Sequence, residues 1–313
     1  MSFTSDIRQE IANVDLEKHC QRAQLSALIQ LTSSLTLSNG GFGIAVRTES
    51  ATCARRIVLL LKELYDADTN VEVARKSNLK KNNVYRIRVE KDGRKILEDL
   101  GLYSSRGLED HPSYGIVMKN CCASAYLAGA FLAYGSCNDP QNPGYHLEIS
   151  LAQIEHANFV LKLLSRFQIE AKIAIRRNRY VVYLKKADYI SDFLSLIKAY
   201  DARLRFEDER IGRDMKNSLS RIDNCEIANE VKTIRAGEKQ VAYINRIIEN
   251  GKYDKLPEKL KNVAQLRLAN PESSLLDLCD SYQKAYGEVI SKSGMKHRLN
   301  KLESYADSLE VVQ

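Results

Sequence analysis

The apolar and polar positions of residues 121–200 predict alternating helices and strands. Residues 121–134 (CCASAYLAGAFLAY) are almost entirely apolar and end before Gly135, a pattern typical of a buried helix. After a turn-rich polar stretch, β-rich runs alternate with segments whose apolar residues recur at helical spacing. The expected strands are 145–151, 169–175 and 180–186, and the further expected helices are 152–167 and 187–200. The predicted order is helix, two strands, helix, two strands, helix.

The same order is predicted for residues 19–102. The expected helices are 19–33, 51–67 and 92–102, and the expected strands are 35–39, 43–49, 69–78 and 83–91. The last two strands form a predicted hairpin with a basic turn at residues 79–82. Leu25 and Leu127, in the two opening helices, lie 102 residues apart. Agreement over seven elements predicts an internal duplication.

From about Arg205 the strand signals disappear, and the remaining residues predict an all-α domain. Residues 205–250 are rich in charge and helical in pattern, and Gly251 is expected to end this run. Further helices are expected over residues 255–270, 273–287 and 291–309. The last two form a helix-turn-helix candidate over about residues 273–306.

The last expected helix has the two faces of a DNA-recognition helix. Met295, Leu299, Leu302 and Ala306 form its apolar stripe. Residues 291–301 carry four Lys or Arg and no acid, whereas residues 201–313 as a whole are nearly balanced in charge. The candidate DNA-binding residues are Ser291, Lys292, Ser293, Lys296, His297, Arg298, Asn300 and Lys301. The alternative is a small helical bundle with a basic outer face.

Composition and charge describe an ordinary soluble globular protein, with 44% hydrophobic and 28% charged residues. No long apolar window predicts a membrane span, and the acidic N-terminus argues against a secretory signal. The net charge of +7 favours a polyanionic partner only weakly. Seven cysteines without CxxC or His/Cys spacing argue against a disulfide framework and a zinc site. We expect a cytoplasmic protein without a metal or cofactor.

One stretch, YLAGAFLAYGS (residues 126–136), resembles the LAGLIDADG signature of homing endonucleases. Its counterpart 102 residues upstream is LSALIQLTS (residues 25–33). The resemblance implies an α+β fold with two αββαββα repeats, residues 1–102 with a leading helix and residues 103–204, which form a saddle. The helical domain would then span residues 205–313. The two opening helices would pack through Ser26, Ala27, Ala128 and Gly129, because small side chains let backbones approach closely.

LAGLIDADG nucleases place a carboxylate at the end of each opening helix, where the pair binds metal. The corresponding residues here are Thr32 and Tyr134, and neither supplies an anionic oxygen at neutral pH. The sequence therefore predicts the scaffold without cleavage. The alternatives are a metal-dependent nuclease that uses Asp139 and an RNA-binding factor resembling maturases. His146 and His156 are isolated and are interpreted as surface or strand residues.

Basic residues on the predicted strands form a second candidate interface. Alternate residues of a strand share a face, so Arg86 and Arg88 lie opposite Ile87 and Val89. A groove that contacts phosphates would consist of Arg86, Arg88, Lys172, Arg176, Arg179 and Lys185. The alternative is a solvated outer face of the sheets, and the groove could equally bind a protein or a small ligand.

Four motifs in order resemble the WhiA family of bacterial regulators. They are AGAFLAYGSCNDPQNPGYHLEI (128–149), NCEIANEVKT (224–233), LRLANPESSLLDL (266–278) and SKSGMKHRLNKL (291–302). Departures are modest: Glu226 stands where aspartate is common, and Ser220 where asparagine is common. The resemblance implies a non-enzymatic, sequence-specific transcription regulator linked to cell division, chromosome segregation and, in some lineages, sporulation. Its partner would be double-stranded DNA in the nucleoid, with a protein partner possible through the first 204 residues and no membrane association.

Overall fold

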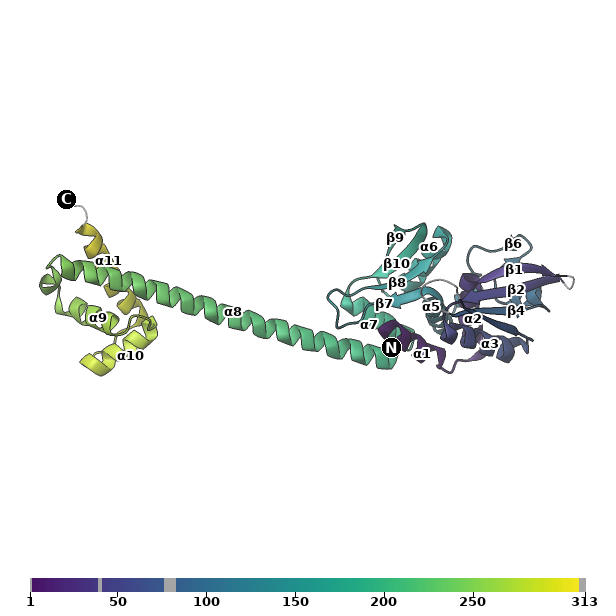
Figure 1. Cartoon of the computed structure of the whole chain (residues 1–313), viewed down its shortest axis with the longest axis horizontal. Coiled ribbons are helices and arrows are strands. Elements are labelled where there is room, and N and C mark those ends of the chain that lie inside the picture. The colour runs from purple at the N-terminus through teal and green to yellow at the C-terminus, as the bar shows by residue number, and fades with distance from the viewer. Residues whose placement is uncertain (1, 39–40, 76–82, 310–313) are drawn as a thin grey trace. The chain divides into compact units, whose positions relative to one another are not determined.

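The computed structural model describes residues 2–38, 41–75 and 83–309 (Figure 1). The chain divides into two compact units, Met1–Arg213 and Asp214–Gln313, called here the first and second units. The basic turn predicted at residues 79–82 lies outside the described residues.

The first unit contains two copies of one order of elements. The first copy consists of α2 (Lys18–Thr32), β1 (Ser33–Ser38), β2 (Gly41–Thr48), α3 (Ala51–Tyr65), β3 (Asn70–Arg75), β4 (Asn83–Val89) and α4 (Gly93–Asp99). The second consists of α5 (Asn120–Tyr134), β7 (Gly135–Cys137), β8 (Leu147–Leu151), α6 (Ile154–Arg166), β9 (Lys172–Arg176), β10 (Arg179–Leu184) and α7 (Ala187–Leu196). The leading helix is α1 (Phe3–Ala12). A short β5–β6 hairpin (Tyr103–Ser104, Gly107–Leu108) and a 3-10 turn (Tyr114–Val117) link the copies.

Both copies build the same antiparallel sheet. The strand orders are β1-β2-β4-β3 and β7-β8-β10-β9. A two-residue turn joins β9 to β10, because Arg176 pairs with Arg179 and both Arg177 and Asn178 have positive φ. The duplication and the α+β class predicted from the sequence are therefore confirmed.

The opening helices α2 and α5 pack against each other at small residues, and Figure 1 shows them between the two sheets. A Cβ added to Gly129 would lie 2.5 Å from the Gln24 carbonyl oxygen and 3.0 Å from the Ala27 Cβ. Ala27 and Gly129 therefore form the expected close contact. The Ser26 hydroxyl donates instead to the Leu100 carbonyl, which follows α4, at 2.8 Å.

Helix α5 ends at Tyr134, directly before Gly135, as the sequence predicted. Gly135 has extended geometry (φ −77°, ψ 149°) and is the first residue of β7. The sequence predicted a strand here without giving its bounds. Glycine is needed here because a Cβ would collide with the Phe131 ring. The chain therefore passes directly from helix to strand without a left-handed cap.

His156 is a buried helical residue rather than the surface or strand residue that was expected. It lies in α6 with 3% of its surface exposed, and its Nε2 is 2.7 Å from the Tyr126 hydroxyl. That hydroxyl also reaches Gln30 Oε1 at 3.0 Å, so three helices meet at one polar network. Burial, with a smaller effect from His111, lowers the pKa of His156 to about 4.

We expect the first unit to lose stability as the pH falls from about 6.5 to about 4. In the unfolded chain, His156 binds a proton once the pH falls below its ordinary pKa of 6.5. In the folded state, it stays neutral down to about pH 4, so acid favours the unfolded chain in this range. The free energy of unfolding of the first unit should fall by about 3 kcal/mol by about pH 4. Urea unfolding at pH 7 and pH 4.5 measures it, and His156→Gln, which does not titrate, should reduce the pH dependence. An equal dependence in wild type and variant would refute this assignment; exposed His297→Gln serves as the control.

Helix α8 (Tyr200–Glu249) is one continuous helix of 50 residues, where several charge-rich helices were expected. It ends at Glu249, and Gly251, which the sequence predicted to end this helical run, follows with a φ of 64°. The 3-10 turn Tyr253–Lys255 and helices α9 (Glu258–Ala269), α10 (Leu275–Tyr286) and α11 (Lys292–Ser308) follow. They enclose a second hydrophobic core that includes Ile247, Val263 and Leu278.

Candidate nucleic-acid interface

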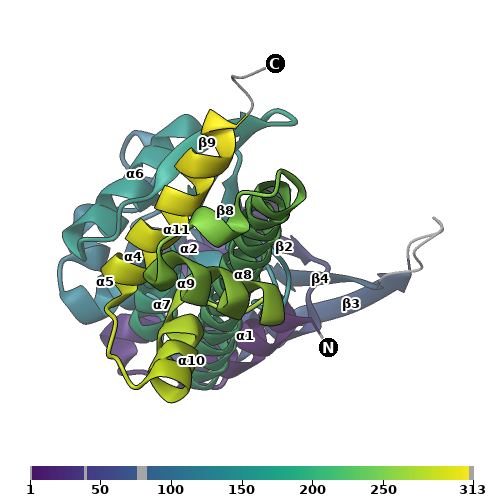
Figure 2. The same cartoon turned by 90° about the vertical axis from the view of Figure 1, so that its left-hand side faces the viewer.

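Local sequence signals position α10 and α11 as the predicted helix-turn-helix. Ser274 and Asp277 form a capping box that starts α10. Gly287, with a φ of 68°, ends it. The Ser291 hydroxyl then caps α11 by accepting from the Gly294 amide at 3.1 Å. The short connection between the caps places α11 against α9 and α10, and Figure 2 shows the three helices together.

Helix α11 presents one buried and one exposed face. Its stripe of Met295, Leu299, Leu302 and Ala306 is at most 2% exposed, as the sequence indicated. The exposed candidates are Ser291, Lys292, Ser293, Lys296, His297, Asn300 and Lys301. Positive charge near the start of this face adds to the positive end of the helix dipole, so the face attracts phosphates and other anions.

Arg298 stands apart from the other candidates because the second unit itself engages its side chain. The side chain is 17% exposed. Its guanidinium lies over the Tyr282 ring, 5.1 Å from the centroid, and 3.7 Å from a Glu288 carboxylate oxygen. Arg298 therefore braces α11 against α10 and the turn that follows it, and we leave it out of the proposed DNA-contacting set.

A buried arginine shapes the turn between α9 and α10. Arg267 is 2% exposed, and its Nη1 donates to the carbonyl oxygens of Asn270, Pro271 and Ser273 at 3.2, 3.3 and 2.7 Å. Burial lowers the pKa of this guanidinium from its ordinary value. Gly237 of α8 faces the same turn, since a Cβ there would collide with the Pro271 carbonyl oxygen. The motif LRLANPESS thus carries its own anchor in Arg267.

The basic residues of the first sheet share an exposed face, as their alternation indicated. Arg86 and Arg88 are exposed on β4, whereas Ile87 and Val89 are buried. Arg88 also lies 3.3 Å from Glu72 of the neighbouring strand. This ion pair removes part of the positive charge that a phosphate groove would need.

In the second sheet, two of the predicted groove residues, Arg176 and Arg179, are engaged by neighbouring side chains. Arg176 lies 3.4 Å from Glu148. Arg179 donates to the Ser150 hydroxyl at 2.8 Å and covers the Tyr134 ring, 5.0 Å from its centroid. Lys172 and Lys185 are exposed. Because Glu72 and Glu148 lie beside Arg88 and Arg176, the surface that carries the six predicted basic residues has mixed charge.

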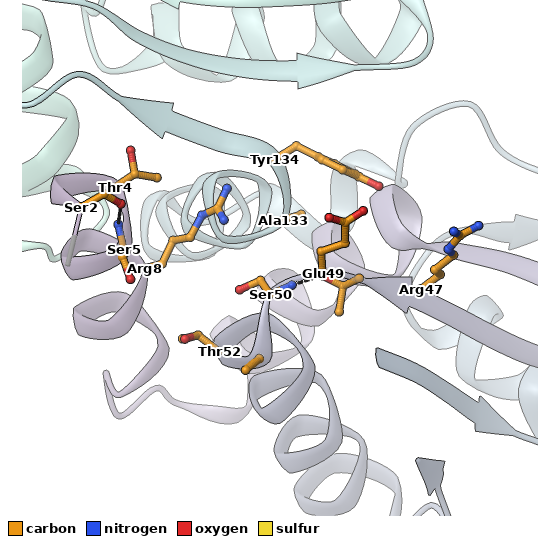
Figure 3. A pocket seen from close by; sticks show the side chains of 12 residues that line it. Ser2, Thr4, Ser5, Arg8, Arg47, Glu49, Ser50, Thr52, Ala133 and Tyr134 are labelled. Atoms are coloured by element: carbon orange, nitrogen blue, oxygen red, sulfur yellow. Dashed lines mark hydrogen bonds between the residues drawn. The ribbon is translucent and has the colours of Figure 1, made fainter. Parts of the chain in front are cut away.

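Both positions of the missing acids have other structural uses. Thr32 is buried, and its hydroxyl donates to the Leu28 carbonyl one turn earlier, at 2.6 Å. Tyr134 lies beside a cleft formed by α1, the β2–α3 turn and the end of α5 (Figure 3). Among the described residues that line this cleft, Glu49 is the sole carboxylate, and Arg8 and Arg47 are basic.

The surroundings of this cleft oppose the paired-carboxylate chemistry of a nuclease. Arg8 Nη2 donates to the Gly135 carbonyl at 2.6 Å, so a positive charge is fixed beside the end of α5. Asp139, the residue of the nuclease alternative, lies 3.6 Å from Arg205 and accepts from the Gln141 amide at 3.0 Å. A divalent cation would face repulsion from Arg8 without a matched pair of anionic oxygens to compensate.

One group of residues that the sequence interpretation missed comes together at the opposite end of the helix pair. His19 and Cys20 of α2 lie next to Cys121 and Cys122 of α5, with their ligand-type atoms within 4.8 Å of one another. Burial and the neighbouring thiols raise the pKa of Cys20 to about 12. The sequence interpretation missed this group because it considered only residues that are close along the chain. The available signal was the repeat: His19 and Cys121 are 102 residues apart, and so are Cys20 and Cys122.

The fold and the site define a class: a duplicated LAGLIDADG-like scaffold joined to a C-terminal helix-turn-helix region. Family models agree, since those for the WhiA N-terminal LAGLIDADG-like domain, the WhiA LAGLIDADG-like domain and the WhiA C-terminal HTH domain match residues 18–103, 123–216 and 219–306. The chain belongs to the WhiA family.

Relatives and a solved structure match along nearly the whole chain. The "Probable cell division protein WhiA" of Bacillus licheniformis is 43% identical and aligns with 100% of this chain and 98% of its own length. The protein of the same name from Bacillus pumilus is 42% identical, covering 99% and 97%. The crystal structure of full-length DUF199/WhiA from Thermatoga maritima shares the fold, with a TM-score of 0.58, 23% identity and coverage of 98% and 99%. Within the described residues, no helix is long and apolar enough to cross a membrane.

Proposed function

We propose that the chain is a sequence-specific DNA-binding regulator that reads bases with α11. The observation that carries this proposal is the exposed face at the start of α11, over residues 292–301, which carries basic side chains and no acid, while the opposite stripe is anchored in the core. Lys296, His297 and Asn300 face outwards where base edges would lie, and Lys292 and Lys301 suit the flanking phosphates. The partner is double-stranded DNA, and the place of action is the cytoplasm.

The first 204 residues, in repeats 1–102 and 103–204, serve in this proposal as a non-catalytic scaffold. The use of Thr32 in a helix-internal hydrogen bond and the position of Arg8 beside Gly135 support the loss of cleavage. The mixed charge of the sheet faces favours a protein partner over a second DNA site. The name of the relatives supports a role in cell division. We propose that the chain exerts this role by controlling transcription, with residues 205–313 as the DNA-binding part. Roles in chromosome segregation and sporulation belong to the same proposal.

DNA binding by full-length variants tests the function. In-cell footprinting identifies a bound site, and fluorescence anisotropy then compares that duplex with a shuffled one. Lys296→Ala and Asn300→Ala should each weaken binding to the site by about 5- to 150-fold and change binding to shuffled DNA much less. Lys232→Ala, an exposed lysine of α8, is the matched control and should leave the ratio unchanged.

The contrary results are equally defined. Equal losses on both duplexes would reduce α11 to a phosphate-binding helix without base reading. Absence of binding to any duplex at low salt would refute the proposal as a whole.

A further inference from the structure

The first turns of the two opening helices bring four metal-ligating side chains together. Residues 19 and 20 follow the N-cap of α2 at the same positions that residues 121 and 122 occupy in α5. His19 Nδ1 lies 3.2 Å from the sulfur of Cys20 and 3.2 Å from the sulfur of Cys122. With the sulfur of Cys121, all four atoms lie within 4.8 Å of one another.

We propose that His19, Cys20, Cys121 and Cys122 form a binding site for one divalent, thiol-seeking cation, with zinc as the best match. Three cysteines and one histidine are a donor set of structural zinc sites. Zn–S bonds of about 2.3 Å in a tetrahedron separate ligand atoms by about 3.8 Å. The observed separations are 3.2 Å for two His–Cys pairs and at most 4.8 Å for every other pair, so small side-chain adjustments would bring the four atoms to tetrahedral spacing.

The surroundings complete the features of a metal site. Glu17 Oε2 lies 2.6 Å from His19 Nε2, so this carboxylate orients the ring and leaves Nδ1 to face the sulfurs. Cys20 and Cys122 are buried, whereas Cys121 is exposed and gives an ion a way in. All four ligands stand in the first turn of a helix, two in α2 and two in α5.

This site is distinct from the metal position of LAGLIDADG nucleases. That position lies at the other end of the helices, near Thr32 and Tyr134. Twelve residues separate Cys20 from Thr32, and at 1.5 Å per residue they span about 18 Å. An ion at the cysteines would therefore join the two repeats at one end of their helix pair and would take no part in phosphate cleavage.

Metal content and cobalt spectroscopy of the full chain test the proposal. Protein purified without a polyhistidine tag or chelator should carry about one zinc per chain by elemental analysis. Co²⁺ added to the metal-free, reduced protein should give thiolate charge-transfer absorption and tetrahedral visible bands. Free Zn²⁺ at about a hundred times its dissociation constant should raise the Tm of the first unit by about 5–10 °C.

Variants separate the site from other thiols. Cys121→Ser removes an exposed ligand with little effect on packing and should weaken Co²⁺ absorption and affinity, and Glu17→Gln should lower affinity about 10- to 100-fold. Cys225→Ser removes an exposed thiol of α8 and should change neither. The proposal is overturned if the wild type binds no more Zn²⁺ or Co²⁺ than the double variant that carries both Cys20→Ser and Cys122→Ser. A disulfide between two of these cysteines in the metal-free protein as isolated would overturn it as well.

Discussion

Replacing Gly129 with valine is expected to lower the free energy of unfolding of the first unit by about 3 kcal/mol or more. A Cβ at this position would sit 2.5 Å from a backbone oxygen of α2, and backbone cannot rotate away as a flexible side chain can. The two helices would have to separate along the centre of the core. Hydrogen–deuterium exchange of the α2 and α5 amides, with urea unfolding, measures the loss.

Gly212→Val provides the matched control for this prediction. Gly212 is also helical, and a Cβ added to it meets no described atom within 4 Å. Valine has a higher helix propensity than glycine, so the control should be neutral or slightly stabilising. Similar losses for Gly129→Val and Gly212→Val would mean that the close approach of α2 and α5 contributes nothing specific.

Replacing Arg267 with methionine is expected to destabilise the second unit by about 3 kcal/mol. Methionine retains most of the buried volume but donates to none of the three carbonyl oxygens that Nη1 now contacts. The α9–α10 turn would loosen, and α11 would lose the neighbour that fixes its orientation. Urea unfolding, followed by exchange of the α9–α11 amides, tests this.

The same replacement at Arg221 is the control for Arg267→Met. Arg221 is exposed on α8 within the second unit, so Arg221→Met should change stability by no more than about 0.5 kcal/mol. If Arg267→Met has an equally small effect, the three hydrogen bonds are not what holds the turn.

Much of the fold was predictable because periodicity is a local signal and the repeat can be recognised by comparing one part of the sequence with another. Alternation on β4 and the stripe of α11 each place their residues on the correct face before any contact is known. The bounds of strand β7 escaped prediction because three residues are too short to show alternation. The continuity of α8 through Gly237 also escaped, since that glycine serves a packing contact with Pro271 that no local pattern reveals.

The candidate sites were predictable only in part, for a related reason. A helical wheel places Arg298 on a flank of α11 but does not show that Tyr282 and Glu288 lie beside it. Likewise, a search for neighbouring ligands along the chain cannot find His19 beside Cys122, since 103 residues separate them. The repeat offset was the available signal, and it becomes informative once the opening helices are known to pair.

The pairing of equivalent positions has a consequence for how this chain can vary. Ala27 and Gly129 are equivalent by the 102-residue offset and touch each other, and residues 19 and 20 likewise meet residues 121 and 122. The approximate twofold axis that relates the repeats therefore runs along the helix pair. A dimer of single repeats would have to use one residue type twice at every such position. Fusion of the repeats removes that obligation, so histidine can stand opposite cysteine at residues 19 and 121, and threonine opposite tyrosine at residues 32 and 134. Each half can thus specialise while the shared axis is kept.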